Sequence, residues 1–172
     1  MRRRLALGLA GLVASWATDA RAESGVTLGI DIGIHRVDDN FDIDGSWGPA
    51  FASRVGYQFD FRVVRVIPEL QIGYGARGLP ELFQGVGGVR VSFLDWRLMP
   101  VAFAHVGGVA GDLSGLAWDA GGGLDVALGA VTAGLFLAYN RIEEQDLDFA
   151  ARPDDAAAWQ SVQLGAMFTV AL

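Results

Sequence analysis

Charged side chains recur at alternate positions in otherwise apolar segments, where they could form buried ion pairs. Six residues show this most clearly: Asp31, Arg54, Arg65, Glu69, Arg90 and Asp125. Because buried charges are costly unless they are paired, we expect these six to form one network. If the chain turns at Asp60-Phe61, Arg54 lies opposite Ile67 on the next strand and diagonal to both Arg65 and Glu69. Asp31, on the preceding strand, lies at a similar height along the strands. Arg54 should therefore pair with Glu69 and Asp31.

The chain has two histidines, His35 and His105, the side chain most often used for acid–base catalysis. A hydrolytic site would need one of them beside a nucleophile or an acid. His35 lies shortly before Asp38 and Asp39, and His105 shares a strand face with Phe103. Neither belongs to a His-x-Ser arrangement. We therefore expect polar rim or lumen residues and predict no catalytic residue.

Two acidic segments, Arg36–Pro49 and Arg141–Ala158, could attract cations. The first contains Asp38, Asp39, Asp42 and Asp44, and carboxylate oxygens are the ligands that Ca²⁺ and Mg²⁺ take. Asn40–Gly45 resembles the start of an EF-hand loop, but Phe51 stands where the bidentate Glu should be, so that motif fails. The four aspartates are a candidate divalent-cation loop, with a solvated acidic loop as the alternative. We predict no resident metal and no cofactor.

The elements that carry these side chains are strands, because apolar and polar residues alternate. The clearest stretch is Val55–Tyr74, in which we predict a two-residue turn at Asp60-Phe61. The same pattern recurs around Asp95-Trp96 and Gly129-Ala130. In each hairpin, a turn of two residues keeps the apolar rows of both arms on one side.

The alternation predicts eight strands: Val26–His35, Ala50–Phe59, Arg62–Gly75, Val86–Leu94, Arg97–Val109, Leu116–Leu128, Val131–Asn140 and Trp159–Leu172. Their connections alternate between very short and long. This is typical of an all-β, antiparallel up-and-down transmembrane barrel with tight periplasmic turns and longer outer loops. Pro68 and Pro100 lie inside strands, where each removes a ladder hydrogen bond. We expect a bulge or a bridging water at both positions.

Residues 1–22 are predicted to be a signal peptide. Met1–Arg4 is basic, Leu5–Ala17 is apolar, and Ala20-Arg21-Ala22 is a cleavage site. Its removal deletes four Arg and one Asp, so the net charge changes from −7 to −10. An acidic chain is a poor partner for nucleic acid. The absence of Cys excludes a disulfide framework and a thiolate metal site.

With this leader, these strands and a final strand that runs to Leu172, the chain resembles the small eight-stranded bacterial outer-membrane β-barrels. That group contains OmpA-type membrane domains and OmpX-like and OmpW-like proteins. The resemblance covers residues 23–172. It implies a bacterial outer-membrane location, contact with outer-membrane lipid and lipopolysaccharide, and insertion by the barrel assembly machinery. Members usually end in an aromatic residue, whereas Phe168 is the nearest aromatic residue here.

A soluble lipocalin-like barrel is the rival fold, but its interior would be apolar. The second strand face here also carries Gln58, Gln71, Ser92, Gln163 and Thr169, which favours a membrane barrel with a polar lumen. We expect a non-enzymatic protein with a structural or surface-interaction role, contacting an extracellular ligand through its acidic loops. A narrow channel for ions or small solutes and a lipid-modifying outer-membrane enzyme are the alternatives. Since side chains can fill an eight-stranded barrel, we expect a plugged lumen.

Overall fold

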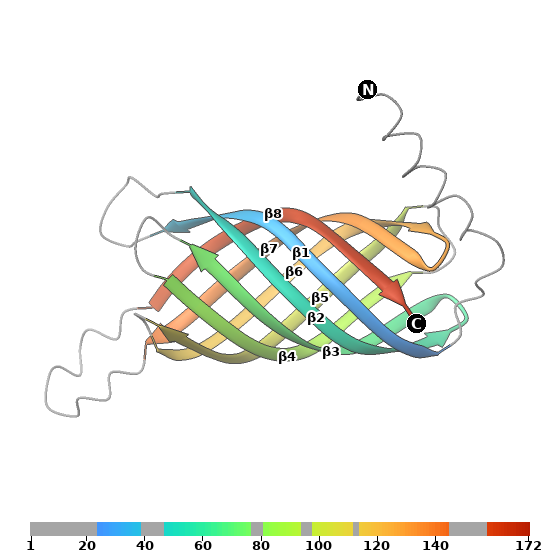
Figure 1. Ribbon diagram of the computed structural model, residues 1–172, viewed down its shortest axis with the longest axis horizontal. Helices are drawn as coiled ribbons and strands as arrows, with labels where there is room; N and C mark the ends of the chain where they lie inside the picture. The colour runs from blue at the N-terminus through green and yellow to red at the C-terminus, as the bar shows by residue number, and fades with distance from the viewer. Residues whose placement is uncertain (1–23, 39–46, 77–80, 94–97, 112–113, 145–157) are drawn as a thin grey trace, which may run out of the picture.

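The computed structural model describes residues 24–38, 47–76, 81–93, 98–111, 114–144 and 158–172. These residues form one closed antiparallel barrel (Figure 1). Its strands are β1 (Gly25–Asp38), β2 (Trp47–Phe61), β3 (Val64–Ala76), β4 (Glu81–Phe93), β5 (Met99–Gly111), β6 (Gly115–Leu128), β7 (Val131–Glu144) and β8 (Ala158–Ala171). Each strand pairs with the next, and β8 pairs with β1. The predicted fold is confirmed.

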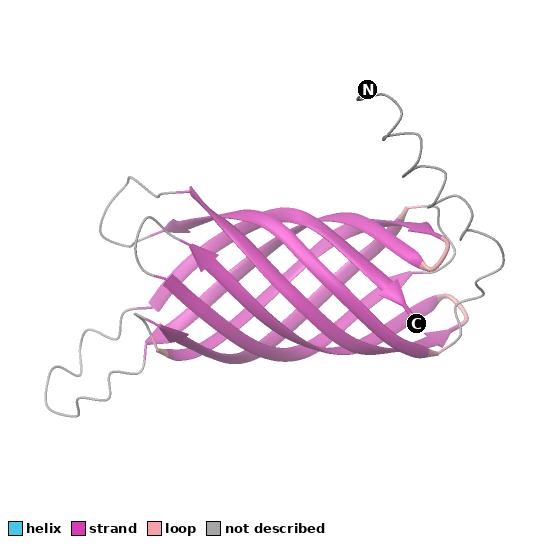
Figure 2. Ribbon diagram, viewed as in Figure 1, coloured by secondary structure: helices cyan, strands magenta, loops and turns pink. Residues whose placement is uncertain are grey.

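Strand direction gives the barrel two different ends. The short β2–β3 and β6–β7 turns lie at the end where β1 begins and β8 finishes (Figures 1 and 2). We call this the tight-turn end, and the opposite end the loop end. No described residue belongs to a helix long and apolar enough to cross a membrane.

The β2–β3 turn lies two residues later than predicted. Arg62 and Val63 form the turn, and Arg62 adopts a left-handed backbone with φ of 48°. Asp60 remains in β2 because its carboxylate faces Arg65, the residue opposite it in β3. The prediction at Asp60-Phe61 was therefore wrong. The shift moves the register by an even number of residues, so every side chain keeps its predicted face.

The other two short connections compare differently with their predictions. Gly129-Ala130 joins β6 to β7 as predicted, with Leu128 opposite Val131. Gly129 has a φ of 76°, a conformation that glycine adopts without steric cost. The predicted Asp95-Trp96 turn lies outside the described residues. Its register would place Ser92 opposite Met99, whereas the structure places Ser92 opposite Val101.

The two strand faces have opposite polarity. Apolar side chains cover the outside, where Leu70, Leu135 and Leu164 are 64%, 67% and 50% exposed. Aromatic pairs occur near both ends: Tyr57–Phe59 towards the tight turns, and Trp118–Tyr139 towards the loops. A barrel that is apolar outside and polar inside matches the membrane-spanning type. The lipocalin-like alternative is excluded because its polar and apolar faces would be reversed.

The strand proline Pro68 produces no bulge. Gly56 pairs with Glu69 and Phe59 with Val66, so the register is the same before and after the proline. The ladder lacks only the two intervening pairs, because proline has no N–H to donate. On its other side, Pro68 pairs with Val89. Pro100 is the second residue of β5. The pairing of β5 with β4 begins only at the next residue, Val101, so Pro100 lies outside that ladder.

Candidate functional site

The centre of the lumen is organised around one buried carboxylate, that of Glu69 on β3. It accepts hydrogen bonds from Arg54 Nη1 at 3.1 Å and Arg90 Nε at 3.2 Å. His105 Nε2 lies 3.0 Å from Glu69 Oε1. Glu69 is 5% exposed. Strands β2, β4 and β5 thus each supply one partner to a carboxylate on β3.

A glycine allows His105 to reach Glu69 across an intervening strand. Gly88 of β4 lies directly between Glu69 of β3 and His105 of β5 in the register. A Cβ atom at Gly88 would come within 2.5 Å of His105 Cδ2. Because glycine has no side chain, the imidazole occupies that space and contacts a residue two strands away.

Arg54 makes both ion pairs expected from the sequence. Its Nε and Nη2 donate to the two carboxylate oxygens of Asp31, each at 2.8 Å, in addition to the bond to Glu69. Such two-point guanidinium–carboxylate contacts are among the stronger ion pairs in proteins. The residue opposite Arg54 is Gln71, not Ile67 as predicted, because the turn lies two residues later.

His105 also contacts a second carboxylate. Its Nδ1 lies 2.6 Å from Asp119 Oδ1, and Gln84 Nε2 donates to Asp119 Oδ2 at 3.5 Å. A neutral imidazole has one donor nitrogen and one acceptor nitrogen, whereas an ionised carboxylate only accepts. The His105 group therefore holds one extra proton, either on the ring or on one of its carboxylates.

Aromatic and sulfur side chains surround the ionic centre. The Phe103 ring stacks on His105 with centroids 5.6 Å apart, and the Arg90 guanidinium carbon lies 5.3 Å from the Phe103 centroid. Phe136 packs edge-on against Phe103, and Arg90 Nη1 donates to Met167 Sδ at 2.8 Å. These contacts fill the lumen beside the ion pairs.

The structure separates Arg65 from this group. Arg65 Nε donates to Asp60 Oδ1 at 2.9 Å, and Nη2 donates to Asp60 Oδ2 at 3.4 Å. Both side chains are partly buried, near the tight turns. The predicted single network is therefore two groups: the lumen charge network of Asp31, Arg54, Glu69, Arg90, His105 and Asp119, and the Asp60–Arg65 pair.

Asp125 is the sixth predicted lumen charge, and it belongs to neither group. It is 6% exposed, yet Oδ1 has no hydrogen-bond partner, and no described residue forms an ion pair with it. Its neighbours on the lumen face are Met99 of β5 and Gly134 of β7. The Met99 thioether cannot donate a hydrogen bond, and Gly134 has no side chain.

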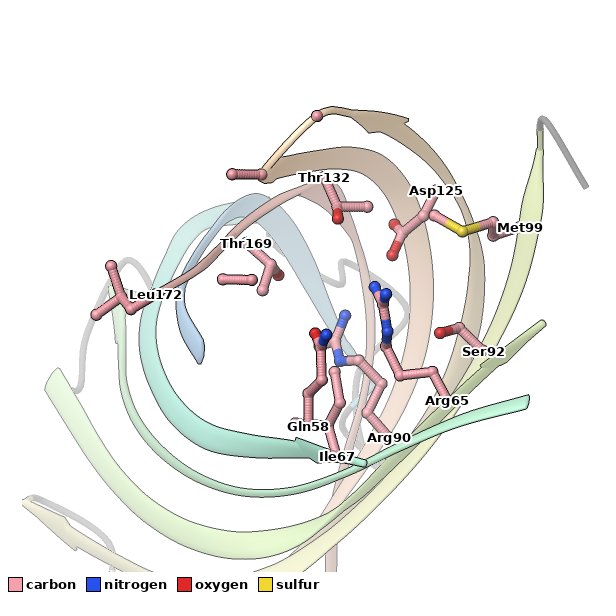
Figure 3. A pocket seen from close by; sticks show the side chains of 13 residues that line it. Gln58, Arg65, Ile67, Arg90, Ser92, Met99, Asp125, Thr132, Thr169 and Leu172 are labelled. Carbon is pink, nitrogen blue, oxygen red and sulfur yellow. The ribbon is translucent and has the colours of Figure 1, made fainter. Parts of the chain in front are cut away.

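Cavities lie on both sides of the charge network. The one at the tight-turn end, the turn-end cavity, has a volume of ≈190 Å³ (Figure 3). One of ≈50 Å³ lies towards the loop end, lined by His35, Asn140 and Ser161 among others. Between them is a void of only ≈10 Å³, bordered by Asp31, Arg90 and Asp119 with Phe103 and Phe136. A single water needs about 10–15 Å³, so the network nearly closes the lumen.

The candidate divalent-cation loop cannot be compared with the structure. Asp39, Asp42 and Asp44 lie outside the described residues, as does the side chain of Asp38. Within the described part, no three histidine or carboxylate side chains are grouped so that they could hold a metal ion. His35 is buried on the lumen face at the loop end.

Comparisons with known proteins concern the fold. No protein-family model and no curated protein matches the sequence. The solved structure of Neisserial surface protein A (NspA) matches with a TM-score of 0.60 and 14% identity, covering 87% of this chain and 98% of that one. The outer membrane enzyme PagL matches with a TM-score of 0.51 and 12% identity, covering 85% and 99%.

The chain has the fold of the small eight-stranded outer-membrane β-barrels. This confirms the resemblance seen in the sequence. At 12–14% identity the likeness is one of fold, and it assigns no activity.

Three residues of this outer-membrane-type barrel were not in the predicted network: Asp60, His105 and Asp119. Asp60 was placed in a turn, and His105 was expected to be a polar residue of the rim or lumen without a role in the network. The alternation puts His105 and Asp119 on lumen faces, where they are opposite each other. The predicted Asp95-Trp96 register would have placed Val86, not Gly88, beside His105, which hid its route to Glu69.

Proposed function

We propose that this chain is a non-enzymatic outer-membrane barrel with a closed lumen, and that it acts as a structural element or through surface interactions at its loop end. Its outer surface suits lipid, and its charged side chains are directed inwards. Tight turns face the periplasm in such barrels, so the loop end would face outwards. That end continues into the two acidic segments, which suit a cationic partner or the divalent cations that bridge lipopolysaccharide phosphates.

The observation that carries this proposal is the ≈10 Å³ void between the two larger cavities. A conducting pore requires a continuous path wide enough for an ion with part of its water shell. Here Arg90, Asp31 and Asp119 lie across the path, and each is held by ion pairs or by hydrogen bonds to charged groups. Opening it would require breaking several buried contacts at once.

Conductance in planar bilayers tests the closed lumen. The unaltered barrel should show no steady openings. The double variant Phe103→Ala/Phe136→Ala removes both rings beside the void and should raise the conductance. A matched control, Leu135→Ala, removes a side chain from the outer face and should stay silent. Steady, well-defined openings in the unaltered barrel would contradict the closed lumen and support the channel.

A separate test addresses the enzyme alternative. A lipid-modifying site should face the membrane, whereas His105 is 4% exposed, inside the lumen, with a carboxylate at each ring nitrogen. No described serine or threonine hydroxyl is hydrogen-bonded to it. Mass spectra of lipopolysaccharide from cells with the barrel, without it, and with His105→Ala should be identical. A modification that His105→Ala abolishes would establish an enzyme instead.

A further inference from the structure

The turn-end cavity contains a buried carboxyl group, that of Asp125, which forms no ion pair with any described residue. Asp125 borders the cavity together with Arg65 and Arg90, and Figure 3 shows its carboxylate directed into it. The strand register explains the missing partner, because Met99 and Gly134 flank Asp125. A Cβ atom at Gly134 would collide with Asp125 Oδ1, so the carboxylate occupies the space that a side chain there would need.

The other charges of the described residues in the middle and tight-turn half of the lumen cancel. Asp60 is matched by Arg65. Asp31, Glu69 and Asp119 are matched by Arg54, Arg90 and the extra proton of the His105 group. That proton counts equally whether it sits on the ring or on a carboxylate. Asp125 alone has no matching charge among the described residues, and a buried carboxylate in that position is unfavourable unless it takes up a proton or meets a cation.

The lining of the turn-end cavity indicates what kind of cation would fit. Asp125, Ser92 and Thr132 offer oxygen acceptors, and Ile67, Met99 and Ala130 offer apolar wall. A volume of ≈190 Å³ equals about six water volumes at roughly 30 Å³ each, so a bare metal ion would leave most of it unfilled. A divalent ion would also need several carboxylate or carbonyl ligands, and among the described residues that line the cavity only Asp125 carries a carboxylate.

We propose that the turn-end cavity is a binding site for one small organic monocation with a primary ammonium group, anchored by Asp125. A primary ammonium donates three hydrogen bonds, which suits a carboxylate flanked by hydroxyls. Its short alkyl part would lie against Ile67 and Met99. Both cavity arginines already contact carboxylates of their own, Arg65 with Asp60 and Arg90 with Glu69. The site would open towards the periplasm and would not depend on the loops.

Titration calorimetry of the folded barrel in an uncharged maltoside detergent tests this proposal, with n-propylammonium chloride as the probe. We expect saturable binding with one site per barrel. Sodium chloride and tetramethylammonium chloride, which lack N–H donors, should bind at least about tenfold more weakly, because charge-assisted hydrogen bonds contribute that much. β-Alanine, which carries an additional carboxylate, should also bind more weakly.

Asp125→Asn should weaken propylammonium binding at least about tenfold by removing the charge while keeping the size. Gln163→Ala, a polar lumen residue towards the loop end, is the matched control and should leave binding unchanged. Heat-modifiable migration in gels and circular dichroism verify that both variants fold. Absence of saturable binding to the unaltered barrel, equal binding by Asp125→Asn, or tighter binding of β-alanine would overturn the proposal.

Two further variants add a cation at the cavity wall or remove one from the segment of the chain that precedes Met99. Met99→Lys puts an ammonium group directly opposite Asp125, so it should abolish propylammonium binding and raise the urea midpoint of unfolding. Arg97, two residues before Met99, lies outside the described residues. Arg97→Gln should leave binding unchanged. If binding appeared only in Arg97→Gln, the arginine itself would neutralise Asp125 and the ligand site would be refuted.

Discussion

Glu69 and Asp125 are equally buried carboxylates in one lumen, 5% and 6% exposed, with opposite surroundings. Glu69 contacts Arg54, Arg90 and His105, whereas Asp125 has no ion-pair partner among the described residues. Burial alone therefore says nothing about pairing. The difference comes from the residues that the register places on neighbouring strands.

Glycines next to the two carboxylates act in opposite ways. Gly88 leaves room for His105 to reach Glu69 from two strands away. Gly134 leaves room for the Asp125 carboxylate itself, but it has no side chain that could donate a hydrogen bond to that carboxylate. The same residue type therefore allows an additional contact at one site and leaves a carboxylate oxygen without a hydrogen bond at the other.

Glu69→Ala should produce the largest loss of stability. It leaves Arg54, Arg90 and His105 around an empty space, and removing one partner of a buried ion pair typically costs about 3–5 kcal/mol. Urea unfolding in lipid vesicles measures the change. Glu143→Ala, which breaks an exposed ion pair with Arg141, is the control and should cost less than about 1 kcal/mol. Equal effects would show that the lumen charges are hydrated and unimportant for stability.

Asp31→Asn should have the next largest effect. It weakens two bonds from Arg54 at 2.8 Å but leaves Arg54 paired with Glu69, so we expect a loss of about 1.5–3 kcal/mol. A double-mutant cycle with Arg54→Met, measured by the same unfolding, isolates the pair. A coupling energy near zero would mean that the Arg54–Asp31 contact adds nothing to the network.

Asp60→Asn should cost about 1 kcal/mol, because the Asp60–Arg65 pair is only partly buried near the tight turns. This loss should shrink at high salt, since exposed charges are screened while buried ones are less affected. Urea unfolding of the unaltered barrel and of Asp60→Asn, at low and at high ionic strength, checks the prediction. A loss as large as that of Glu69→Ala would place this pair in the same cooperative group.

Asp125→Asn should have the smallest effect, within about 0.5 kcal/mol of the unaltered barrel or slightly stabilising. No ion pair is broken, and a buried carboxyl group without a partner is replaced by an amide of the same size. Urea unfolding without any added amine is the measurement. A loss above about 2 kcal/mol would reveal a partner for Asp125 and erase the contrast with Glu69.

Most of the fold was predictable because strand alternation is a local property. Successive side chains of a strand point to opposite faces, and a register shift by an even number of residues leaves each on its face. Two hairpin registers differ from the prediction in this way. The lumen positions were therefore still predicted correctly for Asp31, Arg54, Glu69, Arg90 and Asp125. Gly129-Ala130 was predictable because glycine suits the positive φ of that turn. Arg62 carries no such signal, so the β2–β3 turn was predicted at the wrong residues.

By itself, the sequence determined the eight strands, their up-and-down order and their polar face, since these depend on residues close together in the chain. Arg54 could also be linked to Glu69 and Asp31, because Glu69 lies diagonal to Arg54 both in the predicted register, opposite Ile67, and in the observed one, opposite Gln71. Only the tertiary structure decided that His105 joins Glu69 to Asp119, that Arg65 turns to Asp60, and that Asp125 lacks a described partner. These outcomes depend on which residues meet across strands, and closure of the barrel fixes that register.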